Sequence, residues 1–455
     1  MPDPDDEKSR SFAAALVAVA LVFAGALAAA AGVTLVAFLA TLLSGGGASA
    51  GWTHVAAIAV FAATYFVIAL GEAPGLRLDR AGAALLGASL MVGLGVMPLD
   101  EAYRAIDFDT ITLLLGMMIV VANLRLSGFF RLASNFVVTR AKSPLALLAA
   151  IVLVTGAFSA FLVNDAICLV MTPLTLELTK RLKRDPLPYL LAVPMASNVG
   201  SVATITGNPQ NMIIGGLSHI PYGAFAAALW PVAAFGLLVT FALLALFYPR
   251  EFLSRERLPE AAPAPARARG FLVFKSVLVT LAMMGFFFAG QPVAKVAIVG
   301  GALLLVTRHV KAEKVYREID WPLLLMFVGL FIVVEGLETT VLTPQAVASI
   351  GNFDLSDAGV LAVVSAILSN LVSNVPAVLA LKPFVAGAAD PQRAWLVVAM
   401  ASTLAGNLTL IGSVANLIVA ERARAAGVAI GFWAYFKVGA PLTLITIAFG
   451  AWRLS

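Results

Sequence analysis

The sequence predicts an all-α polytopic membrane protein, and three observations lead to that prediction. Of the 455 residues, 61% are hydrophobic and 12% are charged, whereas soluble domains average roughly 45–50% and about 25%. The hydrophobic residues lie in runs of about 20, the length that crosses a bilayer as a helix. The basic residues gather in the short gaps between these runs, as in cytoplasmic loops of membrane proteins. The net charge of +5 therefore needs no nucleic-acid partner, and a soluble enzyme is excluded.

Eleven hydrophobic runs are predicted to span the membrane. The first extends from Ser11 to Leu43, far beyond the roughly 7–15 apolar residues of a signal peptide. It is therefore expected to be a retained helix, with the N-terminus in the cytoplasm. The predicted spans cover residues 12–42, 54–71, 81–98, 109–124, 187–217, 223–247, 271–289, 293–307, 321–338, 394–420 and 428–452.

Two further apolar stretches are predicted to be re-entrant hairpins. Basic residues flank 145–179 on both sides, so both of its ends are expected in the cytoplasm. Each arm would have only ~17 residues, which is short for a tilted span. The second stretch, 358–389, has acidic flanks and is expected to enter from the opposite face.

An internal repeat relates the two halves of the chain. Ser159 and Asn164 recur as Ser369 and Asn374, and the segment that ends at Asn211 recurs as the segment that ends at Asn416. The span count gives the two copies opposite orientations, an arrangement found in secondary transporters. The predicted organisation is an N-terminal segment 1–53, a first inverted repeat 54–250, a cytoplasmic linker 251–270 and a second inverted repeat 271–455. A multi-pass protein of the inner (plasma) membrane is expected.

Four polar islands interrupt these apolar segments, two at the predicted hairpin tips and two within the spans 187–217 and 394–420. Glycine and proline there break the helices, and lipid cannot satisfy the freed backbone groups, so such breaks line polar cavities. Helix N-termini at the breaks favour an anion, while Ser, Thr and Asn oxygens suit Na⁺. The predicted substrate-binding residues are Asn164, Asn198, Gly207, Asn208, Pro209, Asn211, Ser373, Asn374, Pro376, Thr403, Gly412, Ser413 and Asn416. The predicted cation-coupling residues are Asp165, Ser159, Thr204, Ser369, Asn370 and Asn407.

Two of these predictions have a structural alternative, one for the islands and one for Asp165. Any single island, taken alone, is explained by small and polar residues that pack transmembrane helices together. Asp165 is the sharpest candidate, since a carboxylate at the bilayer centre costs at least ~2.5 kcal/mol, and its repeat counterpart is Val375. It is predicted to couple a proton or Na⁺. The alternative role is to cap the second hairpin arm, and the two roles are compatible.

The residues around these islands resemble the ion transporter superfamily, from about residue 54 to 452. That group holds arsenite permeases, citrate-type permeases, NhaD-type sodium/proton antiporters and divalent-anion:sodium symporters. The resemblance is carried by Asn164-Asp165, Ser197-Asn198, Gly207-Asn208-Pro209-Gln210-Asn211 and Ser373-Asn374-Val375-Pro376. It implies eleven spans plus two opposed hairpins, an elevator-like transport domain, and tips and breaks that in the symporters bind Na⁺ and a dicarboxylate. Neither tip has the full Ser-Asn-Thr triplet of the symporters.

The function predicted first is secondary active transport of a small anion, an oxyanion or carboxylate that includes arsenite, driven by Na⁺ or H⁺. The alternative is an NhaD-type Na⁺/H⁺ antiporter that binds no anion. A channel and a membrane enzyme are weaker alternatives, because the hairpins imply a moving domain and catalytic motifs are missing. No cofactor, metal site or ATPase subunit is expected; a homodimer is expected because dimerisation occurs among such relatives. The single cysteine, Cys168, follows Asp165 by three residues, but a packed core thiol is the simpler interpretation.

Overall fold

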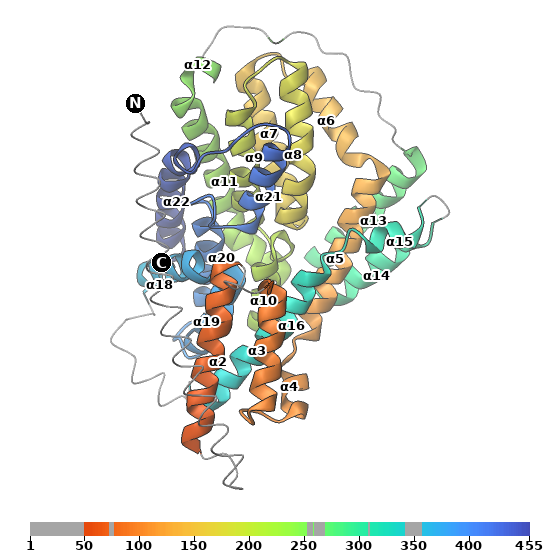
Figure 1. The fold of residues 1–455 in the computed structure, drawn as a ribbon. Coiled ribbons are helices and arrows are strands. Elements are labelled where there is room, and N and C mark those ends of the chain that lie inside the picture. The colour runs from red at the N-terminus through yellow and green to blue at the C-terminus, as the bar shows by residue number, and fades with distance from the viewer. Residues whose placement is uncertain (1–49, 72–76, 253–257, 259–268, 308–309, 342–356) are drawn as a thin grey trace. The chain divides into compact units, whose positions relative to one another are not determined.

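The computed structural model describes residues 50–71, 77–252, 258, 269–307, 310–341 and 357–455 (Figure 1). The described part consists of helices and connecting loops, with no β-sheet in these ranges. The predicted all-α class is therefore confirmed. The predicted first span, 12–42, lies outside the described residues, as does most of the linker 251–270.

Among the described residues, seven helices are long and apolar enough to cross a membrane. Two other predicted spans form the shorter helices α3 (Arg80–Gly93) and α14 (Val293–Leu305), with 14 and 13 residues. At 1.5 Å per residue these are roughly 20 Å long, less than the hydrocarbon core of about 30 Å. The seven long helices are α2 (Ala50–Leu70), α5 (Phe108–Ser127), α7 (Pro144–Phe161), α11 (Tyr222–Phe247), α13 (Gly270–Phe288), α16 (Trp321–Thr340) and α22 (Phe432–Leu454).

The chain divides into two compact units that cut across the predicted repeats. Of the described residues, the first unit comprises those within 50–106 and 325–341, and the second comprises those within 107–324 and 357–455. In the first unit, α2 packs on α3, which the short helix α4 (Leu99–Ala105) follows. Glycines let the backbones approach there: a Cβ on Gly329 of α16 would lie 2.5 Å from the Ala84 carbonyl of α3. All residues of the polar islands lie in the second unit.

Each predicted hairpin is a pair of helices joined by one or two residues. Leu162 and Val163 join α7 to α8 (Asn164–Arg181), and Ser373 alone joins α18 (Ala358–Val372) to α19 (Asn374–Ala386). Ser373 has φ +78°, a left-handed conformation that non-glycine residues rarely adopt. The side from which each hairpin enters the membrane stays a prediction.

Both islands within the spans are interruptions between two helices. The first separates α9 (Pro186–Ser201) from α10 (Pro209–Ser218), with the short 3₁₀ helix η1 (Ile205–Gly207) between them. The second separates α20 (Pro391–Ala405) from α21 (Val414–Ala425). Residues 202–208 are called break 1 below, and residues 406–413 are called break 2.

Repeat-related helices pack in the same pairs. α7 of the first hairpin packs on α9, and α18 of the second packs on α20. The first pair can pack closely because Gly200 of α9 has no side chain. A Cβ at that position would overlap the backbone of Gly156 in α7. α21 contacts both α8 and α9, so the half-helix after break 2 lies against the first hairpin (Figure 1). The remaining described helices are α6 (Phe129–Arg140), α12 (Pro249–Phe252) and α15 (Ala312–Tyr316).

Candidate functional site

Hydrogen bonds of Ser159 and Ser197 join the first hairpin to α9, the helix that precedes break 1. The Ser159 and Ser197 hydroxyls lie 2.8 Å apart, and Ser197 Oγ donates to the Asn164 carbonyl oxygen at 3.0 Å. All three residues are buried. The second hairpin is held in the matching place, since Ser369 Oγ lies 2.9 Å from the Ser402 carbonyl oxygen. The first arm of each hairpin is therefore hydrogen-bonded to the helix that precedes a break.

One asparagine closes each break in the same way. Asn211 Nδ2 donates to the carbonyl oxygens of Ser201 and Thr204, at 3.1 and 3.0 Å. Asn416 Nδ2 donates to the carbonyl oxygens of Gly406 and Thr409, at 2.7 and 3.0 Å. Each donor and both of its acceptors are separated from their counterparts by the same sequence offset of 205. The two repeats therefore share side-chain hydrogen bonds as well as sequence.

The glycines of the two breaks leave room for a backbone carbonyl. A Cβ on Gly207 would overlap the Ser201 carbonyl oxygen. A Cβ on Gly412 would lie 3.0 Å from both the Gly406 carbonyl oxygen and Asn370 Oδ1. Any larger residue at Gly207 must displace backbone, whereas at Gly412 small shifts can relieve the contact.

Polar side chains also connect the two repeats. Asn208 Nδ2 and Gln210 Nε2 of the first repeat lie 3.2 and 3.0 Å from Thr403 Oγ1 of the second. Asn198 Nδ2 donates to Asn407 Oδ1 at 2.9 Å and to Asn416 Oδ1 at 3.1 Å. These residues are all buried, and a buried polar network that is fully hydrogen-bonded fixes a single arrangement of its elements.

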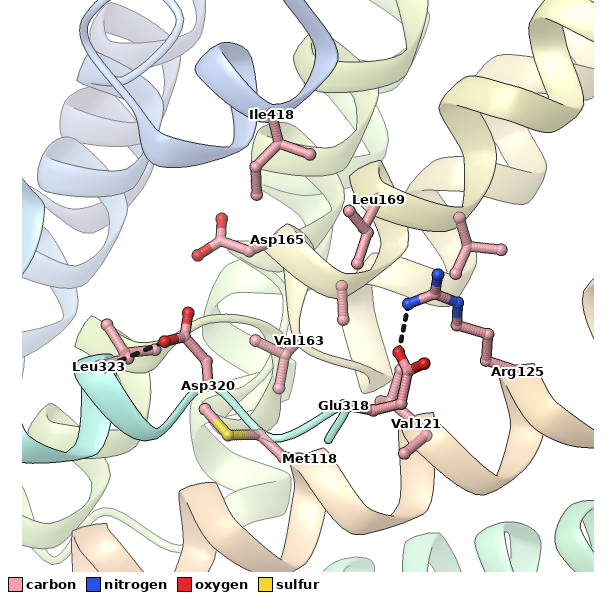
Figure 2. A pocket seen from close by; sticks show the side chains of 13 residues that line it. Met118, Val121, Arg125, Val163, Asp165, Leu169, Glu318, Asp320, Leu323 and Ile418 are labelled. Carbon is pink, nitrogen blue, oxygen red and sulfur yellow. Dashed lines mark hydrogen bonds and ion pairs between the residues drawn. The ribbon is translucent and has the colours of Figure 1, made fainter. Parts of the chain in front are cut away.

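Asp165 lies in the first turn of α8 and lines a cavity of about 110 Å³ (Figure 2). The N-cap of α8 is Val163, so Asp165 is not the capping residue. Figure 2 shows Asp165 and Asp320 on one side of the cavity and the Arg125–Glu318 ion pair on the other. Three carboxylates face one guanidinium, and this excess of negative charge favours a cation in the cavity.

The predicted cation-coupling residues do not form one cluster. Asp165 alone lines the cavity, while Ser159 and Ser369 hold the hairpins. Thr204 donates to the Ala160 carbonyl oxygen, and Asn370 Nδ2 donates to the carbonyls of Ala366 and Ala405, each at 3.0 Å. Asn407 belongs to the network around Asn198.

The predicted substrate-binding residues gather around the two breaks and the two tips. Asn208 caps α10, with its Oδ1 2.8 Å from the Asn211 amide nitrogen. Ser413 caps α21, with its Oγ 3.2 Å from the Ala415 amide nitrogen. Pro209 and Pro376 lie in the first turns of α10 and α19. At the second tip, Asn374 Oδ1 accepts from Ser369 Oγ at 2.6 Å.

Three side-chain oxygens at these sites have no donor in the described part of the chain, and one of them is Asn211 Oδ1 in the first turn of α10. Asn164 Oδ1 at the first tip and Asn370 Oδ1 beside break 2 are buried and find no hydrogen-bond partner among the residues that the structure describes. Unpaired carbonyl-type oxygens are the hard ligands that Na⁺ and similar cations take. Within the described ranges, no group of three His, Cys, Asp or Glu side chains could hold a metal ion.

Some residues of the site carried no signal that the sequence could reveal. Arg125 and Glu318 are 193 positions apart, and each looks like an ordinary charge near the end of a span. Ser201 and Gln210 lie inside a recognised island, but only the structure shows that Ser201 accepts hydrogen bonds in break 1 and that Gln210 contacts the other repeat.

Paired hairpins and paired helix breaks around a buried polar centre define a membrane transport protein, not an enzyme. The sequence profile of the citrate transporter family matches residues 65–405, and the chain belongs to that family. The predicted membership of the ion transporter superfamily is therefore confirmed.

Relatives with sequence similarity along most of the chain are also named transporters. An uncharacterised transporter of Mycobacterium bovis is 31% identical over 422 residues, 87% of this chain and 97% of that protein. The silicon efflux transporter LSI3 of Oryza sativa subsp. japonica is 30% identical over 86% of this chain and 95% of its own. The putative transporter arsB of Dictyostelium discoideum is 25% identical over 82% and 87%.

The fold is also similar to a solved structure. The YdaH transporter of Alcanivorax borkumensis, whose topology is described as unusual, matches with a TM-score of 0.56 at 14% identity. The match covers 89% of this chain and 96% of that one. At this identity the likeness supports the fold alone.

Proposed function

We propose that this protein is a secondary active transporter of a small anion, an oxyanion or carboxylate, coupled to Na⁺ or H⁺. The observation that carries the proposal is a buried amide network in which Asn198 joins the first hairpin tip to break 2, beside a cavity that Asp165 lines. The family profile and the transporter names of the relatives support the class of function.

The anion is assigned to the hairpin tips. Asn208 and Ser413 already bond the first amides of α10 and α21. In the described structure, Val163 and Ser373, the N-caps of α8 and α19, make no such side-chain bond. The N-termini of α8 and α19 thus have no side-chain cap from their N-cap residues, and a helix N-terminus favours negative charge. The tips are thus better suited to an anion than the breaks.

The coupling cation is assigned to the neighbouring oxygens. Asp165 supplies a carboxylate in a cavity with excess negative charge, and Asn164 Oδ1 supplies an unpaired ligand in the preceding residue. A cation at this tip would also offset the charge of an anion bound close by. Cooperative loading of the two ions then follows from simple electrostatics.

The movement is proposed to be of the elevator type. The hairpins are hydrogen-bonded to the broken helices through Ser159 and Ser369, so tips and breaks would move as one body. The inner or plasma membrane is the proposed location, with the linker 251–270 in the cytoplasm. The imposed gradients decide the direction of transport, and the experiment below identifies the coupling ion.

A second candidate is a Na⁺/H⁺ antiporter without an anion substrate. Its specific support is the Asp165 cavity, where a single carboxylate could exchange the two cations. The two candidates differ in what moves: the antiporter carries protons against Na⁺ with no anion present, whereas the transporter carries the anion only with a cation gradient.

Transport into proteoliposomes separates the candidates. Purified protein is reconstituted with an internal pH dye, and Na⁺ or proton gradients are imposed with labelled citrate, arsenite or silicic acid outside. These probes follow the names of the family and its relatives. Uptake of citrate that requires a cation gradient supports the proposal, whereas uptake of arsenite or silicic acid alone, both uncharged at neutral pH, would show transport of a neutral solute and contradict it. Proton counterflow driven by Na⁺ alone, with every probe left outside, supports the antiporter and overturns the proposed anion site.

A further inference from the structure

Asn198 is one of the residues through which the two repeats are hydrogen-bonded to each other. Its Nδ2 donates to Asn407 Oδ1 and Asn416 Oδ1, and its Oδ1 accepts from Asn164 Nδ2 at 3.2 Å and from Ser413 Oγ at 3.3 Å. An amide side chain has two donor hydrogens and two acceptor lone pairs. All four are used by protein groups, and only 1% of the residue is exposed.

This saturation distinguishes Asn198 from the side chains around it. Asn164 and Asn370 each keep an oxygen without a partner, so they can bind a ligand at no cost in hydrogen bonds. Asn198 can bind a ligand only by giving up a bond to another buried polar group, which costs about 1–3 kcal/mol. The geometry of Asn198 therefore fits a connecting residue better than a ligand-binding one.

The four partners join the first hairpin tip to break 2. Asn164 is the first residue after the tip, and Ser413 caps α21. Asn416 bonds the Gly406 and Thr409 carbonyls that close break 2. A rigid planar amide cannot turn to follow one partner without moving its donors and acceptors relative to the others.

We propose that Asn198 is a positioning residue that couples the first tip to break 2, so that loading of one half of the site sets the geometry of the other. When Asn164 turns its free oxygen toward a cation, its Nδ2 moves relative to Asn198 Oδ1. Asn198 follows, and its Nδ2 shifts against Asn407 and Asn416, which hold break 2. Asn198 itself contacts neither ion.

The connection has no equivalent in the other direction. The repeat counterpart of Asn198 is Thr403, whose hydroxyl accepts from Asn208 and Gln210. A hydroxyl carries one hydrogen and turns freely about its C–O bond, so it does not transmit an orientation as an amide does. The coupling therefore passes through a single residue of the first repeat.

Hydrogen exchange tests this inference independently of any transported ion. Asn164→Ala is expected to speed exchange of the break 2 amides, residues 407–413, by about threefold or more in the otherwise native protein. In the Asn198→Ala background the same substitution is expected to add nothing, since the connecting amide is gone. Asn123→Ala is the matched control background: Asn123 is buried, and its Nδ2 bonds only within α5.

Equal effects of Asn164→Ala in the native and Asn198→Ala backgrounds would overturn the inference, as would no effect in either. Should Asn198→Ala fail to fold, Asn198→Leu keeps a similar side-chain volume and removes every hydrogen bond of the connecting amide. It is expected to abolish the same transmission.

Ligand binding gives a second readout, which rests on the proposed function. The affinity of the purified protein for citrate is measured at low and high Na⁺, and the ratio reports the coupling between the two ions. Asn198→Ala is expected to lower that ratio about tenfold, while the affinity for citrate without Na⁺ and the affinity for Na⁺ without citrate each change by less than about threefold. Citrate binding weakened by the same large factor at low and at high Na⁺ would show that Asn198 binds the anion, against the inference. A native protein that binds neither probe counts against the proposed function, and the exchange experiment then decides the inference.

Discussion

The two breaks use the same asparagine to close the backbone, yet they differ in how firmly they are closed. Every residue of break 1 is buried, whereas break 2 has half-buried residues and an Ile411 that is 65% exposed. In break 1 the Ser201 carbonyl accepts from both Asn208 and Asn211. In break 2 the Gly406 carbonyl depends on Asn416. Two donors on one carbonyl hold a bend more rigidly than one.

The two hairpin tips also differ from each other, in the charge that they carry. The first carries Asp165 beside its asparagine, and the second carries Val375 at that position. The first half of the site is therefore charged and preformed, while the second is neutral and less tightly packed. The two repeats share a backbone arrangement but differ in charge and packing at the site, so symmetry of backbone does not imply symmetry of side-chain chemistry.

The largest effect is expected from removing the charge of the first tip. Asp165→Asn removes one unit charge that would lie within about 4 Å of a bound cation, so cation-driven uptake should fall at least about a hundredfold. Proteoliposome uptake measures this. Asp320→Asn, in the same cavity, is the control and should stay within about threefold. Equal losses would show that the cavity's total charge matters, and that the first tip is not special.

The packing difference between the breaks predicts unequal responses to a methyl group. Gly207→Ala places a Cβ on the Ser201 carbonyl and should destabilise the protein by about 1–3 kcal/mol. Gly412→Ala should lower the stability less, because the added Cβ would lie 3.0 Å from its nearest neighbouring atoms. Thermal unfolding in detergent compares the variants. Gly285→Ala, where a Cβ meets nothing within 4 Å, serves as control; a larger drop for Gly412→Ala would reverse the proposed difference.

The hydrogen bonds predict the opposite ranking for the closing asparagines. Asn416→Ala leaves the Gly406 carbonyl without its side-chain donor, while after Asn211→Ala the Ser201 carbonyl still accepts from Asn208. Loss of a buried partner costs about 1–3 kcal/mol, so amides 407–413 should exchange roughly tenfold faster in Asn416→Ala. Amides 202–208 in Asn211→Ala should change less. Similar increases in both variants would mean that Asn208 adds nothing to break 1.

The smallest effect is expected from the ion pair of the cavity. Arg125 and Glu318 keep about a third and a quarter of their side-chain surface exposed, 34% and 26%, and pairs of this kind contribute roughly 1 kcal/mol or less. Glu318→Gln should therefore change apparent stability by only a degree or two and uptake by less than about threefold. A loss of uptake as large as that of Asp165→Asn would show that the Arg125–Glu318 ion pair, and not Asp165, supplies the charge that couples the cation.

Composition and local residue types predicted much of this molecule before its structure was known. Gly and Pro within apolar runs predicted backbone that leaves the helix near Gly207 and Gly412, and both positions lie in breaks. The sequence offset paired Asn211 with Asn416, and the two side chains make the same bonds. The sequence did not predict that α3 and α14 are short, because the apolar residues continue past the positions where these helices end.

The sequence by itself determined that the chain is helical, belongs in a membrane and carries two related halves, because these follow from hydrophobicity and spacing along the chain. Only the tertiary structure decided which polar atoms are already used. The four bonds of Asn198, the free oxygen of Asn164 and the Arg125–Glu318 pair join residues up to 218 positions apart. Hydrogen-bond saturation depends on distances and angles in space, which residue types along a chain do not fix.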